Sequence, residues 1–306
     1  MELIRPDTNI DFVGKRHIAI IFSWAIILIG LVSLVMKGGP EYGIDFAGGT
    51  LVQVKFSEVT GAAKVREGLK DLGLRGMTIQ QVGDQGNEFL VRAQESNSTL
   101  ESLAGKIRTT LEATYGTGNV EIRRTEMVGP QVGKDLRNKG LMAVLFAIVG
   151  MLVYITFRFE FRFGLGAVVA LIHDVLITVT VFSLVGMEID LTVVAAFLTL
   201  IGYSVNDTVI VCDRIRENMG KHAKDTLGSI INRSINETLS RTVMTSGLTL
   251  LSVIALYAFG GSVIKGFAFA MLIGIVIGTY SSIFVASPVI LYWESFKTRR
   301  VAGGKD

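Results

Sequence analysis

The chain has 306 residues, half of them hydrophobic, and a mean hydropathy of +0.50. Soluble domains of this size rarely reach such values, so the composition excludes an ordinary soluble protein and favours one with long apolar membrane spans. The net charge is only +3, and we expect no nucleic-acid partner. The single cysteine, Cys212, excludes an intrachain disulfide, and no Cys/His spacing typical of zinc sites is present.

Six apolar stretches are close to membrane-spanning length. The first, IAIIFSWAIILIGLVSLVM, is too long for the apolar region of a signal peptide and lacks an A-x-A-like cleavage site, so we predict an uncleaved anchor. The predicted membrane helices cover 18–36, 140–157, 164–185, 190–212, 242–259 and 266–293.

The basic residues predict the orientation of these spans. They precede the first span, lie between the second and third, and follow the fourth and sixth, whereas the loop VGMEID has none and GGSVIK has only Lys265. By the positive-inside rule, the N-terminus 1–17 and the tail 294–306 are cytoplasmic, and the segment 37–139 lies outside, in the periplasm or its equivalent. The stretch 213–241 is amphipathic and basic, and it either lies along the inner membrane surface or is a solvated connector.

The external segment contains a predicted α+β domain. We predict strands in IDFAGGTLVQVKFS, MTIQQVG, NEFLVRAQ and NVEIRRTEMVGP, and helices in TGAAKVREGLKDLGL and STLESLAGKIRTTLEATYG. The order βαββαβ is typical of a ferredoxin-like unit. That fold serves many functions, and this domain contains no catalytic or nucleotide-binding motif.

The fourth apolar stretch contains Asn206 and Asp207, although a carboxylate there costs roughly 2.5–3.5 kcal/mol on insertion scales. Helical spacing places Thr199, Tyr203, Asn206 and Asp207 on one face, with Thr208 beside them. This polar stripe should point into the helix bundle. Asp207 is either a proton-exchanging acid or a structural carboxylate held by its neighbours.

Two further polar features interrupt the apolar stretches. Arg241 precedes the fifth span and is followed by Thr245 and Ser246. Because the fourth and fifth spans are antiparallel neighbours, we predict that Arg241 pairs with Asp207; simple extension of Arg241 toward the membrane surface is the alternative. The third span contains Asp174 after a histidine, roughly 15 Å deep at 1.5 Å per residue. It forms either a helix-packing hydrogen bond or a proton relay.

Six motifs in order resemble those of the SecF family, whose members are subunits of the SecDF protein-export factor in the resistance-nodulation-division (RND) superfamily. They are YGIDFAGGT, MVGPQVGKDL, ALIHDV, GYSVNDTVIVCDRIREN, SRTVMTS and GTYSSIFVASPV, and together they extend over nearly the whole chain. The resemblance implies that this chain is the six-helix half of an RND-type protein and carries one periplasmic domain. SecD would supply the other six spans.

The resemblance also implies a site and partners. The family's membrane proton site matches Asp207 and Arg241, beside Asn206, with Asp174 as a secondary candidate. The coupling ion would be the proton, with sodium as the alternative, and no bound cofactor is expected. Implied partners are SecD, the SecYEG channel, YajC, YidC, unfolded preproteins and membrane lipid, in the bacterial cytoplasmic (inner) membrane.

The expected function is use of the proton-motive force to promote preprotein translocation through SecYEG and release on the periplasmic side. Two alternatives stay open: a structural assembly subunit of the translocon, and half of an RND-type exporter of small molecules or lipids. An enzyme is not expected, because the chain has no H-E-x-x-H or G-x-S-x-G motif.

Overall fold

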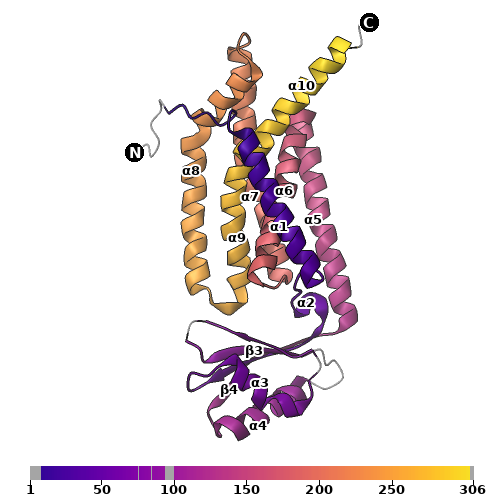
Figure 1. Cartoon of the computed structure of the whole chain (residues 1–306), viewed down its shortest axis with the longest axis vertical. Coiled ribbons are helices and arrows are strands. Elements are labelled where there is room, and N and C mark those ends of the chain that lie inside the picture. The colour runs from indigo at the N-terminus through magenta and orange to yellow at the C-terminus, as the bar shows by residue number, and fades with distance from the viewer. Residues whose placement is uncertain (1–7, 75, 84, 94–99, 304–306) are drawn as a thin grey trace.

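The computed structural model describes residues 8–74, 76–83, 85–93 and 100–303. Within these residues, six helical segments are long and apolar enough to cross a membrane, as predicted. Figure 1 shows them as a bundle with a small α+β domain at one end; the start of α1 and the end of α10 lie at the other end. The bundle consists of α1 (Arg16–Lys37), α5 (Pro130–Arg158), α6 (Phe161–Val185), α7 (Leu191–Lys221), α8 (Leu227–Phe259), α9 (Gly261–Ser281), the π-helix η2 (Ser282–Ala286) and α10 (Ser287–Gly303).

Three of these helices are longer than their apolar parts. Helix α5 begins at Pro130, whose fixed φ suits the first helical position, and therefore starts well before residue 140. Helices α7 and α8 take up most of the stretch 213–241, and Thr226 caps α8 by accepting a hydrogen bond from the Ser229 amide at 3.3 Å. The stretch 213–241 is therefore the end of two long helices joined by a short turn, and not a separate helix on the membrane surface.

The last span is continuous but changes its winding. Between α9 and α10 the chain forms the π-helix η2, and Ser287 Oγ donates to the Ser282 carbonyl at 3.1 Å. Short π-helical turns are rare and occur often at functional sites. This one lies next to Ser281, a residue of the candidate site described below.

The α+β domain has a four-stranded antiparallel sheet in the order β2-β3-β1-β4. Its apolar core lies between the sheet and two helices, and includes Val52, Val54, Phe89, Val91 and Leu111. In Figure 1 these helices cover the face of the sheet that points away from the bundle. The element order is compatible with the predicted ferredoxin-like unit. The elements are β1 (Gly49–Phe56), α3 (Ala62–Gly68), η1 (Lys70–Leu72), β2 (Thr78–Gln81), β3 (Glu88–Ala93), α4 (Leu100–Tyr115) and β4 (Val120–Val128).

The prediction of a strand beginning at IDFA is wrong, because these four residues form the short helix α2 (Ile44–Ala47). Gly48 ends it with φ +74, a conformation that favours glycine. A Cβ on Gly48 would lie 2.9 Å from Pro130 Cα. Glycine therefore lets the chain turn into β1 while the start of α5 packs directly against it.

Candidate functional site

Asp207 lies on α7 inside the helix bundle and is 1% exposed. Its Oδ2 accepts a hydrogen bond from Ser246 Oγ on α8 at 2.9 Å, whereas its Oδ1 has no hydrogen-bond partner among the residues that the structure describes. Buried carboxylate oxygens are normally satisfied, since an unpaired one costs free energy. The structure therefore leaves half of this carboxylate open to a proton, an ion or a group from another chain.

A third helix contributes to the Asp207 site. Thr279 Oγ1 on α9 lies 2.9 Å from Ser246 Oγ, so a hydroxyl chain runs from α9 through α8 to the carboxylate. Thr242, one turn before Ser246, has a buried hydroxyl for which the described part of the chain offers no hydrogen-bond partner. The i, i+3, i+7 spacing of Thr242, Thr245 and Thr249 in the sequence predicts that they line one face of this helix. No feature of the sequence pointed to Thr279.

The predicted Asp207–Arg241 ion pair is not formed. Within the described residues, no ion pair within 4.0 Å joins them, although Arg241 is close enough to act on Asp207 electrostatically. Arg241 and Asn206 are both exposed, on the outside of α7 and α8. The polar stripe of α7 was predicted to point into the bundle as a whole, but its residues do not all do so. Neighbouring residues point about 100° apart around a helix with 3.6 residues per turn. Asp207 points inward, and Asn206 points outward.

The polar residues predicted near Asp207 and Arg241 make different contacts; they are Tyr203, Thr208, Thr245 and Ser246. Tyr203 and Ser246 join α7 to α8, since the Tyr203 hydroxyl lies 3.1 Å from both the Thr245 carbonyl and Thr249 Oγ1. The Thr245 hydroxyl bonds the Arg241 carbonyl of its own helix at 3.0 Å. Thr208 likewise donates back along α7, to the Ser204 carbonyl at 3.3 Å.

Asp174 forms a second buried acid cluster, near the middle of α6. It is 0% exposed, and its Oδ2 accepts from Ser204 Oγ at 2.6 Å and from Ser281 Oγ at 2.9 Å. Its Oδ1 lies 3.0 Å from Nδ1 of His173. Both carboxylate oxygens are thus satisfied, in contrast to those of Asp207.

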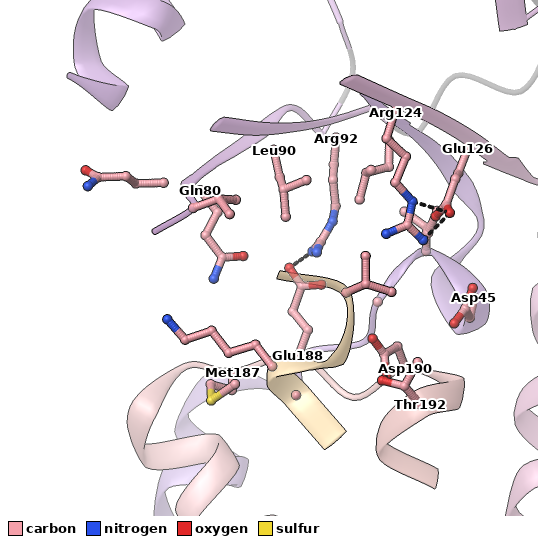
Figure 2. A pocket seen from close by; sticks show the side chains of 18 of the residues that line it. Asp45, Gln80, Leu90, Arg92, Arg124, Glu126, Met187, Glu188, Asp190 and Thr192 are labelled. Carbon is pink, nitrogen blue, oxygen red and sulfur yellow. Dashed lines mark hydrogen bonds and ion pairs between the residues drawn. The ribbon is translucent and has the colours of Figure 1, made fainter. Parts of the chain in front are cut away.

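A cavity of about 710 Å³ lies between the α+β domain and the bundle. Figure 2 shows Arg92 from β3 reaching across it to Glu188, in the loop between α6 and α7. Burial lowers the pKa of Arg92 to about 10, while Asp190, Asp45 and Glu41 act in the opposite direction. The guanidinium stays charged at neutral pH and joins the domain to the membrane part.

The backbone strengthens this junction. The Ile189 amide donates to the Glu41 carbonyl at 2.7 Å, and the Gly43 amide donates to the Ile189 carbonyl at 2.9 Å. The Asp45 carboxylate accepts from the Leu191 amide at 3.0 Å. The segment that enters the domain is thus bonded to the start of α7, the helix that carries Asp207.

Neither acid cluster is a cage for a metal ion. In the part of the chain that the structure describes, no group of three or more His, Cys, Asp or Glu side chains could hold one. The chemistry available at Asp207 is therefore that of a single buried carboxylate with neighbouring hydroxyls.

The sequence and the fold of this chain match those of one known protein family. Residues 107–296 match the family model described as "Protein export membrane protein SecD/SecF, C-terminal", and residues 33–58 match the "SecD/SecF GG Motif". The chain is 49% identical over 293 residues to the "Protein translocase subunit SecF" of Desulfurispirillum indicum, covering 93% of this chain and 92% of that protein. The chain belongs to the SecF family. The SecF of Calditerrivibrio nitroreducens is 45% identical, with 98% and 99% covered.

Two solved SecDF structures share the fold. The crystal structure of SecDF from Thermus thermophilus, titled a translocon-associated membrane protein, matches with a TM-score of 0.84 and 35% identity over 96% of this chain. SecDF in a "Super-membrane-facing form" matches with a TM-score of 0.70 and 36% identity over 99% of this chain. The SecF-family chain spans only 40% and 41% of those two chains. Membership in this family and the six apolar helices make it an integral inner-membrane protein.

Proposed function

We propose that this chain is the SecF half of a SecDF complex that uses an ion gradient to promote preprotein translocation through SecYEG and release on the periplasmic side. The observation that carries the proposal is the open Oδ1 of Asp207, inside the membrane part. A proton arriving there removes the charge of a buried carboxylate. Moving one charge across the membrane releases about 2.3 kcal/mol per 100 mV, which is enough to bias a two-state element.

The exposed residues on the outer face of α7 and α8 favour the proposal that a second membrane half packs there. The exposed residues there are Thr199, Gly202, Asn206 and Arg241, and a Cβ on Gly202 would have no atom of the described residues within 4 Å, apart from its own helix backbone and chain neighbours. Polar residues in a membrane helix rarely face lipid, and small residues allow another helix to approach closely. SecD is the proposed partner on this face, since the solved SecDF chains contain more than twice the length that this chain covers.

The remaining partners follow from the family. We assign SecYEG as the channel, unfolded preproteins as the substrate, and YajC and YidC as further components, in contact with membrane lipid. Both termini are assigned to the cytoplasm by the distribution of Lys and Arg, which places the α+β domain in the periplasm. Reporter fusions at residue 306 and in the domain test this topology directly.

The test uses membrane vesicles that contain this chain, SecD and SecYEG. A preprotein is stalled midway, ATP is removed, and a proton gradient is imposed. We expect the wild type and Asp207→Asn to assemble equally with SecD, and only the wild type to complete translocation. Asp213→Asn, which removes an exposed carboxylate farther along α7, is the matched control and should behave as the wild type.

Other outcomes point to other functions. If Asp207→Asn moves preprotein as well as the wild type, the carboxylate is structural and the chain is an assembly subunit of the translocon. If translocation follows a sodium gradient and not a proton gradient, sodium is the coupling ion, held by Asp207 with neighbouring hydroxyls. Gradient-driven release of small apolar molecules without SecYEG would instead indicate half of an exporter.

A further inference from the structure

The second acid cluster is one end of a hydrogen-bonded chain between α6 and α1. His173 Nε2 lies 3.0 Å from Ser23 Oγ on α1, and Ser23 Oγ lies 3.0 Å from the Tyr280 hydroxyl on α9. The Tyr280 hydroxyl donates to the Ala19 carbonyl on α1 at 2.7 Å. His173 and Ser23 are 7% and 5% exposed, so water does not replace these contacts.

The direction of every hydrogen bond in this series is determined by its last donor, Tyr280. A tyrosine hydroxyl has one hydrogen, and Tyr280 uses it on Ala19, so Ser23 must donate to Tyr280. Ser23 then has no hydrogen left for His173, so the His173 Nε2 must carry a proton and donate to Ser23. The alternative tautomer would leave the Ser23 and Tyr280 oxygens 3.0 Å apart with no hydrogen between them.

The same reasoning gives the number of protons on the acid. With Nε2 protonated, the 3.0 Å contact between His173 Nδ1 and Asp174 Oδ1 needs one further hydrogen between those two atoms. Whether that hydrogen is on nitrogen or on oxygen, the pair as a whole is neutral. A neutral pair fits a site with 0% exposure, where an isolated charge would be costly.

We propose that His173 and Asp174 form a second proton-holding site, whose discharge releases the Tyr280 hydroxyl from the Ala19 carbonyl of α1. The proton leaves by a concerted transfer: Nε2–H passes to Ser23, the Ser23 proton passes to Tyr280, and the original Tyr280 proton passes to water. The Tyr280 hydroxyl bonds the carbonyl of Ala19, which lies about one turn from Arg16, the first residue of α1. The proton therefore reaches water at the basic end of α1, where the helix meets the membrane surface. Protons and charges balance, since one hydronium forms and the pair changes from neutral to singly negative.

The transfer reverses the direction of the hydrogen bonds between His173, Ser23 and Tyr280. Tyr280 now donates to Ser23, and Ser23 donates to Nε2, so the bond from Tyr280 to the Ala19 carbonyl is lost. The remaining negative charge on Asp174 is already supported, since it accepts from two serine hydroxyls and from the Nδ1–H of His173. Discharge therefore loosens the contact between α9 and α1 while the acid remains bonded.

Other titratable groups near this level of the bundle influence the site differently. On α5, α7 and α9, which pack against α6, they are Tyr154, Tyr203, Asp207, Cys212 and Tyr280, while α1 carries charged side chains only at its ends. Helix α10 also packs against α6 and carries Tyr292 and Glu294, and Glu294 bonds Arg162 at the start of α6. Tyr203 bonds α8, and Cys212 belongs to a separate apolar cluster. A charge on Asp207 would oppose discharge, because it adds a second anion. The inference itself concerns a site separate from Asp207, and it stands whether or not Asp207 is the coupling residue.

The test reads the His173 tautomer in the full chain. The protein is labelled with ¹⁵N-histidine, placed in lipid nanodiscs and titrated, and the signals are assigned with His17→Gln and His222→Gln variants, since the chain has three histidines. We expect a protonated Nε2 at neutral pH and a change to the Nδ1–H tautomer with a bare Nε2 at higher pH. A neutral Nδ1–H tautomer at neutral pH, or no change up to the pH of unfolding, overturns the proposal.

Tyr280→Phe tests the link to α1. The variant keeps the ring beside His173 (6.0 Å between ring centres), so the fold should be retained. Without the hydroxyl, nothing holds Ser23 in the donor direction, and the tautomer change should move to lower pH by about one pH unit, the size expected for one hydrogen bond. Tyr154→Phe, at a 60% exposed site on α5, is the matched control. Equal midpoints in the wild type and Tyr280→Phe overturn the link between discharge and the Ala19 contact.

Discussion

The ion pair between Arg92 and Glu188 should hold the α+β domain against the membrane part, and Glu188→Gln tests this. The two side chains are 19% and 20% exposed. The free-energy cost of breaking the pair should therefore lie between the costs for a fully buried pair and for an exposed pair. Breaking a fully buried pair costs about 3–5 kcal/mol, and an exposed pair contributes about 0.2–1 kcal/mol. We therefore expect a cost of about 2 kcal/mol, or a roughly 30-fold shift toward the undocked domain.

Spin labels on the domain and on the bundle would measure this shift as a change in the distance distribution between them. Glu126→Gln is the matched control, because Glu126 pairs with Arg124 within β4 and the pair does not cross the junction (Figure 2). The double variant Arg92→Met/Glu188→Leu should recover most of the lost docking, since it leaves no buried charge unpaired. Unchanged distances in Glu188→Gln, or equal changes in Glu126→Gln, would refute the role of this pair.

Three further predictions concern other parts of the chain. Ser246→Ala removes the hydrogen bond to Asp207 and should slow gradient-driven translocation about tenfold, whereas full activity would show that the hydroxyl has no role in the ion site. Gly48→Ala combines φ +74 with a Pro130 contact at 2.9 Å and should lower the free energy of unfolding by about 2 kcal/mol or more; an unchanged thermal midpoint would contradict the close approach. Asn232→Ala removes the acceptor of the Phe12 and Val13 amides, so the amides of this N-terminal segment should exchange hydrogen faster in mass spectrometry, and equal exchange would show that the segment is held by its apolar contacts.

The sequence predicts the membrane spans better than it predicts the helices that contain them. Hydropathy finds the part of a helix that lies in lipid, and it ends where charged residues begin. The first turns of α5 carry Lys134, Asp135, Arg137 and Lys139, so the apolar stretch begins at 140 although the helix begins at Pro130. The same effect hides the polar ends of α7 and α8. The short helix α2 was missed for another reason: its residues suit a strand, and the glycines on either side allow a helical turn.

The candidate site shows a similar division. A carboxylate in an apolar helix is visible in any sequence, so Asp207 and Asp174 were both found. Their partners were predicted less well, because a hydrogen-bond partner depends on the rotation of each helix about its axis. Charge suggested Arg241 for Asp207, but α8 presents Ser246 to the carboxylate and leaves Arg241 exposed. Small hydroxyl residues are common in membrane helices for packing, so spacing alone did not single out Thr279.

The two buried acids differ in a way that bears on the proposed function. Both oxygens of the Asp174 carboxylate are hydrogen-bonded within this chain, so in our proposal its proton leaves by rearranging bonds between α6, α1 and α9. Among the described residues, Oδ1 of Asp207 has no hydrogen-bond partner, and Asn206 and Arg241 are exposed on the outer face of α7 and α8. A site completed by a second chain responds to assembly, whereas a site closed within one chain responds to proton concentration and to the charges near it. If both exchange protons, loss of SecD should abolish exchange at Asp207 and leave the His173 tautomer change intact.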